Sequence, residues 1–157
     1  MGTIILNRKQ KLYLAAPLFS DIERRFNIEL AEQLERFFDV FLPQRDGGLM
    51  ATMISGGMQP SVAARTVFQA DISALEECDV VLIVLDGRTV DEGAAFELGY
   101  AHALGKTCFG LQTDVRRLLT TGNNPMIDCG IRQVFQEVEE LVSWASQFTL
   151  MQSAVSL

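Results

Sequence analysis

The chain has 157 residues, 48% of them hydrophobic, and its formal net charge is −7. This length and composition predict a single globular domain over residues 1–157 with a substantial core. The negative charge argues against binding to a nucleic-acid polymer or a membrane surface, because such surfaces need clustered positive charge. No apolar run approaches the roughly 18 residues that a membrane-spanning helix needs.

The cysteines do not form a metal-binding or disulfide pattern. Cys78, Cys108 and Cys129 are an odd number without close pairing, and two of them lie in or beside apolar runs. Buried, reduced thiols are therefore expected, which is typical of a cytoplasmic protein. Because the sequence also contains no CxxC motif and no His/Cys cluster, we expect no structural metal ion.

Short apolar runs predict the strands. The run at 80–85 is apolar at every position and rich in β-branched residues, which is typical of a parallel strand covered on both faces. Pro17 and Pro43 end two of the other runs. Strands are predicted over residues 12–16, 40–42, 80–85, 107–111 and 131–135.

Helical spacing of apolar residues separates these strands. Ser20 and Glu23 form the pattern of a capping box at the start of the first helix. Strands that alternate with helices predict a three-layer α/β fold with a parallel sheet of about five strands. Helices are predicted over residues 20–38, 61–77, 92–104 and 136–150, and residues 151–157 are expected to fray.

The segment 44–60 contains four glycines and three methionines and shows little periodicity. It is predicted to be a loop with at most one helical turn. Loops of this length inside a compact domain are usually functional, so a lid over a site is one interpretation. A disordered insertion is the other.

The segment after the central strand carries the strongest sign of a functional site. Asp86 and Gly87 end the strand, and Asp91 can cap the next helix by accepting from its free N–H groups. Glu97 shares a helix face with Gly93, whose small size leaves a hollow beside the carboxylate. Helical side chains lean toward the helix N-terminus, so Glu97 points toward the carboxyl ends of the strands, where ligands bind in such sheets.

Two interpretations of Glu97 are open on this local pattern. A carboxylate in a small hollow is suited to act as a nucleophile or a general base. A solvent-facing glutamate on a helix that packs through its alanines has the same pattern. A dinucleotide or nucleoside triphosphate cradle is not supported, because the GxGxxG and Walker motifs are both absent.

Three segments resemble one known family. The sequences YLAAPLF at 13–19, DGRTVDEGAAFELGYA at 86–101 and NPM at 124–126 are similar, in matching order, to those of nucleoside 2-deoxyribosyltransferases. The resemblance covers nearly the whole chain. It implies a flavodoxin-like or Rossmann-like fold and an enzyme that cleaves the N-glycosidic bond of 2′-deoxynucleosides and transfers the sugar to another base.

The resemblance also implies catalytic roles. Glu97 matches the nucleophile that attacks the anomeric carbon and forms a covalent glycosyl-enzyme. Asp91 matches an acidic residue that binds a deoxyribose hydroxyl, and Asp71 matches an acidic residue near the base that could transfer a proton to the leaving nitrogen. Tyr13 matches a tyrosine that orients the nucleophile. No metal or organic cofactor is needed for this chemistry.

The remaining site residues are implied in the same way. Leu18 and Phe19 match residues that line the base and sugar pocket, and Gln44 is a candidate base contact. Asn124 and Met126 match a segment that a neighbouring subunit contributes to the site. The implied partners are therefore deoxynucleosides, free nucleobases and further copies of the chain in a homo-oligomer.

Two alternatives to base exchange remain. The first is an N-glycosidase that passes the sugar to water, with a deoxynucleoside or its 5′-monophosphate as substrate; the apolar loop at 15–19 argues for an unphosphorylated substrate. The second is a non-catalytic module that senses nucleotides. Three acids around a neutral sugar argue against that module, because pure binding has no need for them.

Overall fold

Five parallel strands form one sheet at the centre of the molecule. The computed structural model describes residues 8–116, 119 and 122–155, and its sheet has the strand order β2-β1-β3-β4-β5. This order is that of flavodoxin-like doubly wound folds. The predicted fold class is confirmed. The strands are β1 Lys11–Ala15, β2 Asp39–Phe41, β3 Val80–Val84, β4 Thr107–Leu111 and β5 Gln133–Phe135.

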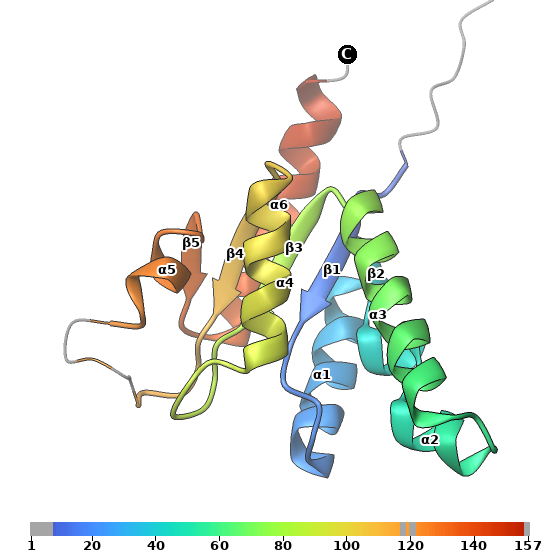
Figure 1. Cartoon of the computed structure of the whole chain (residues 1–157). Helices are drawn as coiled ribbons and strands as arrows, with labels where there is room; N and C mark the ends of the chain where they lie inside the picture. The colour runs from blue at the N-terminus through green and yellow to red at the C-terminus, as the bar shows by residue number, and fades with distance from the viewer. Residues whose placement is uncertain (1–7, 117–118, 120–121, 156–157) are drawn as a thin grey trace, which may run out of the picture.

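Helices cover both faces of the sheet and make three layers (Figure 1). Helices α1 and α6 pack on one face, and α3 and α4 pack on the other. Every residue of β3 is buried, as expected for a strand covered on both sides. The helical elements are α1 Asp21–Leu34, the π-helical turn η1 Pro43–Gly47, α2 Met50–Ser55, α3 Pro60–Glu77, α4 Glu92–Ala103, α5 Pro125–Asp128 and α6 Val138–Val155.

The alternation of side chains along β1 decides which residues face the site. Leu12 and Leu14 belong to the core under α1 and α6, whereas Tyr13 and Ala15 belong to the core under α3 and α4. This alternation follows from the period of two in a β-strand. Tyr13 consequently points toward the helix that carries Glu97.

The prediction of a loop over residues 44–60 is wrong for most of that segment. Residues 43–47 form η1 and residues 50–55 form α2, which lies beside the lower end of α3 (Figure 1). Met50, Met53 and Ile54 have helical spacing, but no residue of α2 is buried, so the helix has no buried apolar face that ties it to the core. The turn η1 is fixed instead by polar contacts to its neighbours.

Two helix ends also differ from the predictions. The capping box of Ser20 and Glu23 is confirmed, but α1 ends at Leu34, short of residue 38. Helix α6 continues to Val155, beyond the predicted end at residue 150. The expected fraying of residues 151–157 stays a prediction, and 156–157 lie outside the described residues. Within the described part of the chain, none of the helices is long and apolar enough to cross a membrane.

Candidate active site

The candidate site lies at the carboxyl ends of β1 and β3. In this strand order the chain leaves these two neighbours in opposite directions, and the crevice between them is where open α/β sheets bind ligands. Helix α4 follows β3 and carries Glu97, while β1 carries Tyr13. The fold therefore brings together two residues that are 84 positions apart in the chain.

A short hydrogen bond joins Tyr13 to Glu97. The Tyr13 hydroxyl donates to Glu97 Oε1 at 2.6 Å. Tyr13 is completely buried, and its ring stacks on Phe41 with centroids 5.4 Å apart. Burial, together with the neighbouring carboxyls of Glu97 and Asp71, raises the pKa of Tyr13 far above its ordinary value, so the hydroxyl remains a donor. The bond holds one carboxylate oxygen and leaves Oε2 for another partner.

The start of α4 is organised by Asp91. As predicted, Asp91 caps the helix, and its carboxylate accepts from the backbone N–H of Ala94 at 2.9 Å. A side chain at Gly93 would come within 3.1 Å of the Asp91 carboxylate. The small residue therefore leaves the Asp91 carboxylate room at the helix end.

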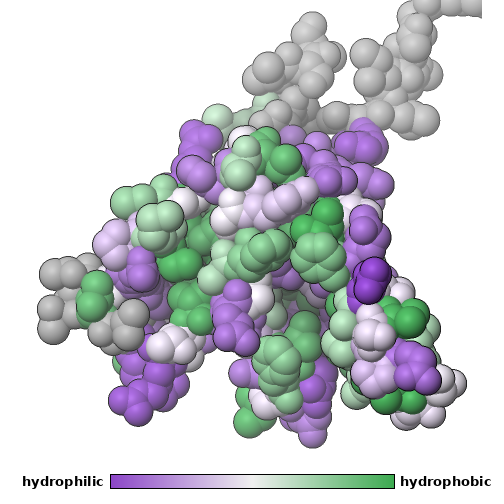
Figure 2. Space-filling view, viewed as in Figure 1, coloured by the Kyte–Doolittle hydropathy of each residue, from purple (hydrophilic) through white to green (hydrophobic). Residues whose placement is uncertain are grey.

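Glu97 and Asp71 line one cavity between α3 and α4. Its volume is about 320 Å³, at the small end of the usual range for ligand pockets. Phe68 and Phe96 stand at its rim, each 54% exposed, with ring centroids 6.2 Å apart. Figure 2 shows hydrophobic side chains gathered on this face of the molecule. The remaining lining residues are Ala64, Val67, Ile72, Leu75 and Gly93.

Two carboxyls, those of Glu97 and Asp71, set the electrostatics of the cavity. No Lys or Arg is among the lining residues. The pKa of Glu97 is raised to about 8, chiefly by burial and further by the charges of Asp71 and Asp91, against the lowering effect of the hydrogen bond from Tyr13. Burial likewise raises the pKa of Asp71 to about 6. Near neutral pH the two carboxyls therefore hold about one proton between them.

Asp71 has an unusual environment. Its Oδ1 atom is buried and makes no hydrogen bond to any described residue. Buried polar atoms normally have a partner, and exceptions often mark functional groups. Asp71 is therefore a candidate for contact with a ligand.

The residues expected to bind the base differ in their exposure and in their hydrogen bonds. Leu18 is partly buried and Phe19 is 76% exposed, both on the segment that follows β1. Both ends of the Gln44 side-chain amide are already engaged: its Nε2 donates to the Arg24 carbonyl at 2.9 Å, and its Oε1 accepts from Asn27 at 2.9 Å. The expected base contact of Gln44 would require it to leave these partners.

Asn124 and Met126 lie away from this cavity in the same chain. Asn124 caps α5 by accepting from the N–H of Met126 at 2.9 Å, and Met126 is 82% exposed. Together with Arg88 they line a separate hollow of about 250 Å³. The single chain therefore does not bring them to Glu97, so any role at that carboxylate requires a second copy.

Sequence reasoning missed two features of the site. One is the aromatic pair at the rim, Phe68 and Phe96; the spacing of Phe68 and Asp71 on one helix, three residues apart, could have indicated it. The other is Gly47, which lies against Asp71. The Gly47–Gly48 pair in the connection that follows β2 was a signal of close backbone approach.

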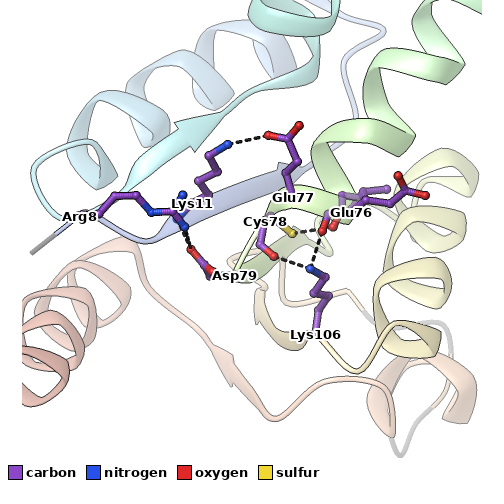
Figure 3. Close-up of polar contacts among 8 residues, drawn as sticks. Arg8, Lys11, Glu76, Glu77, Cys78, Asp79 and Lys106 are labelled. Carbon is purple, nitrogen blue, oxygen red and sulfur yellow. Dashed lines mark hydrogen bonds and ion pairs between the residues drawn. The ribbon is translucent and has the colours of Figure 1, made fainter. Parts of the chain in front are cut away.

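A larger hollow of about 680 Å³ lies at the opposite edge of the sheet. Several of its charged groups are paired: Arg8 with Asp79 at 3.3 Å and Lys11 with Glu77 at 2.6 Å (Figure 3). Nearby, the Lys106 ammonium donates to the Glu76 and Cys78 carbonyls at 2.7 Å each. These charged groups are paired or hydrogen-bonded, whereas Asp71, whose Oδ1 atom has no partner among the described residues, lies toward the other end of the strands.

The strand order and the layers of helices define a flavodoxin-like α/β protein in which two carboxyls line a small cavity. The chain belongs to the nucleoside 2-deoxyribosyltransferase family, whose model matches residues 12–143. The predicted family is confirmed. A comparison with curated proteins finds no match.

Solved structures share the fold. A conserved protein from Enterococcus faecalis is 26% identical with a TM-score of 0.73, over 88% of this chain and 98% of its own. A 2-deoxyribosyltransferase from Bacillus psychrosaccharolyticus is 24% identical with a TM-score of 0.68, over 84% and 90%. A CMP N-glycosidase from Clostridium botulinum is 18% identical with a TM-score of 0.55, over 88% and 99%.

Proposed function

We propose that the chain is a nucleoside 2-deoxyribosyltransferase that cleaves the N-glycosidic bond of 2′-deoxynucleosides and passes the sugar to another purine or pyrimidine base. The observation that carries the proposal is the Glu97 carboxyl, held by Tyr13 at 2.6 Å beside a cavity that Asp71 also lines. Family membership supports it. A carboxylate nucleophile and a separate acid are the groups that this reaction needs.

In the first step, Glu97 Oε2 attacks the anomeric carbon C1′ as the bond from C1′ to the base nitrogen breaks. The electron pair of that bond moves to the nitrogen, and the proton of Asp71 goes to the base. The reactive form of the pair has Glu97 ionised and the single proton on Asp71, which is the minor arrangement because the pKa of Glu97 is the higher of the two. The oxocarbenium character that develops on the sugar is stabilised by the adjacent carboxylate. Tyr13 keeps Oε1 in place, and Asp91 binds a sugar hydroxyl.

In the second step, a nitrogen of an incoming base attacks C1′ and the ester to Glu97 breaks. The proton of the incoming nitrogen returns to Asp71, so the enzyme regains its starting state. Two displacements at one carbon retain the configuration of the anomeric centre. The apolar lining around Glu97 favours a planar base over water as the acceptor.

Hydrolysis of the same bond is the second candidate. The similarity of fold to a CMP N-glycosidase favours it, because that protein acts on a nucleoside monophosphate. A phosphate requires cations or free N–H groups, and the lining of the cavity contains two carboxyls and no Lys or Arg. An unphosphorylated deoxynucleoside is therefore the better substrate. A sensing module is less favoured, since a raised pKa on two acids serves chemistry better than binding.

The site is proposed to be shared between subunits of a homo-oligomer. Asn124 and Met126 line a hollow that is separate from the Glu97 cavity in the same chain. A second copy that docks against the exposed rim of Phe68 and Phe96 would bury that apolar surface. The same docking would let the neighbour's segment around Asn124 complete the site.

The test is chromatography of the purified protein with deoxyinosine, with and without free adenine or cytosine. A new deoxynucleoside that forms only with the acceptor base supports transfer, whereas free deoxyribose that forms regardless of acceptor supports hydrolysis. Mass spectrometry after acid quenching should find one deoxyribosyl group on the wild type and none on Glu97→Ala. Glu92→Gln is the matched control, because Glu92 is an exposed carboxylate on the same helix. Turnover by Glu97→Ala would reject the assignment of the nucleophile.

A further inference from the structure

Gly47 lies directly against the carboxyl of Asp71. Gly47 is buried at the end of η1, and a Cβ atom at this position would lie 2.7 Å from Asp71 Oδ1 and 3.5 Å from Phe41 Cζ. The first distance is shorter than carbon and oxygen atoms tolerate without a bond. The space that the Asp71 carboxyl occupies therefore exists because residue 47 has no side chain.

The backbone at Gly47 has little freedom to retreat. The Asp46 carboxylate accepts from the Leu42 N–H at 2.8 Å, which closes the turn on itself. Arg45 donates to Glu35 at 2.6 Å and to the Val40 carbonyl at 2.9 Å, and so ties the turn to α1 and β2. An added methyl group would consequently move Asp71 more than it moves η1.

Hydrogen bonds do not hold Asp71 Oδ1 in place. That atom has no partner among the described residues, and Asp71 lies on α3 one turn before the fully buried Leu75. Packing against Gly47 and the course of α3 are what define the position of this oxygen. A π-helical turn at this place fits the frequent occurrence of such turns at functional sites.

We propose that Gly47 is a positioning residue for proton transfer: the bare backbone of η1 holds the Asp71 carboxyl in the orientation that delivers its proton to the leaving base. This inference rests on the proposed function. The proton of Asp71 goes to the base nitrogen as the bond from C1′ breaks, and the electron pair of that bond remains on the nitrogen. The atoms nearest to a Cβ at Gly47 belong to Asp71 and Phe41 and not to Glu97 or Tyr13, so the substitution acts first on the proton donor rather than on the attack at C1′.

Gly47→Ala tests this role through its dependence on the leaving group. The substrates are deoxynucleosides whose purine bases differ in basicity, including an N7-methylated purine that leaves without protonation. General acids contribute about 10²–10⁴-fold, so we expect kcat/KM on deoxyinosine to fall at least about tenfold, and kcat/KM on the methylated substrate to change less than about threefold. The ratio of the two values does not depend on the fraction of folded enzyme, so a loss of stability cannot imitate it.

Gly99→Ala is the matched control, because a Cβ at Gly99 meets no atom within 4 Å. It should leave both substrates unchanged. In an Asp71→Asn background, Gly47→Ala should add less than about twofold to the loss on deoxyinosine, since the two changes remove the same proton transfer. An equal loss on both substrates, or an undiminished loss in the Asp71→Asn background, would overturn the inference.

A crystal structure of Gly47→Ala gives a readout that does not depend on activity. The Asp71 carboxyl should be displaced from its position, while the bond from Tyr13 to Glu97 should persist. An Asp71 carboxyl at its original position would overturn the inference. If the wild type transforms no deoxynucleoside while Gly47→Ala still displaces Asp71, the proposed function fails and the geometric part of the inference stands.

Discussion

Glu97→Gln should make the folded protein more stable. Glutamine has the shape of a protonated glutamic acid and can still accept the Tyr13 hydrogen bond, but it never ionises. The wild-type carboxyl does ionise as the pH rises, in a cavity that disfavours its charge because of burial and the nearby Asp71 and Asp91. The substitution therefore removes an unfavourable charge and retains the packing.

The magnitude follows from the pKa of Glu97. Its ordinary value is 4.5, and the folded protein raises it to about 8. A raised pKa gives stability that is complete below about pH 4.5 and is lost progressively as the pH rises through 8. At about 1.4 kcal/mol per pH unit, the loss reaches at most about 3 kcal/mol at pH 7 and about 5 kcal/mol well above pH 8. Glu97 is only partly buried and its charge is coupled to that of Asp71, so about half of each figure is the better expectation.

Urea unfolding of both proteins between pH 5 and pH 9 measures the effect. The difference in unfolding free energy should grow with pH and exceed about 1 kcal/mol at pH 7. Glu92→Gln, on the exposed side of the same helix, should show no such growth. A Glu97→Gln variant whose advantage is independent of pH, or which is less stable at pH 9, would refute the raised pKa and the electrostatics inferred for the cavity.

Three further predictions concern activity. Tyr13→Phe removes the bond that lowers the pKa of Glu97, so its kcat/KM should fall about tenfold and the falling limb of its pH profile, near pH 8, should move upward; an unmoved falling limb would exclude this role. The wild-type kcat/KM should be bell-shaped with limbs near pH 6 and 8, because the active form carries one proton on the pair of Asp71 and Glu97, and a rate that keeps rising above pH 8 would exclude Asp71 as the acid. Equal amounts of Glu97→Ala and Asn124→Ala subunits, each inactive alone, should recover up to about a quarter of wild-type activity after exchange if neighbours share sites.

The fold was predictable because its signals are local and repeated. The fully apolar run at 80–85 and the capping box at Ser20 each identify an element from within a few residues. These local signals do not give the strand order. The position of β1 between β2 and β3 depends on pairing between residues far apart in the chain. The elements η1 and α2 were missed because no buried apolar stripe marks α2 and because η1 depends on contacts with Glu35, Asn27 and Arg24.

The candidate site, like the fold, has residues that local sequence patterns indicate and residues that they do not. Asp91 and Glu97 could be found from the helix that carries them, because capping and the spacing to Gly93 are local properties. That Tyr13 meets Glu97 required the alternation along β1 and the strand order together. The contact of Gly47 with Asp71 could not be foreseen, since it depends on how a π-helical turn packs against α3.

Carboxylates at the two ends of the sheet have opposite electrostatic environments. The difference indicates at which end the proposed chemistry takes place. At one end the carboxylates of Asp79 and Glu77 are paired with cations, which costs the fold nothing. At the other end Glu97 and Asp71 face a cavity that has no Lys or Arg among its described lining residues, and both carry raised pKa values that reduce stability near neutral pH. A sequence optimised for stability alone would have glutamine or a small apolar residue at 97. The retained cost is therefore best explained by chemistry that needs one carboxyl ionised and its neighbour protonated.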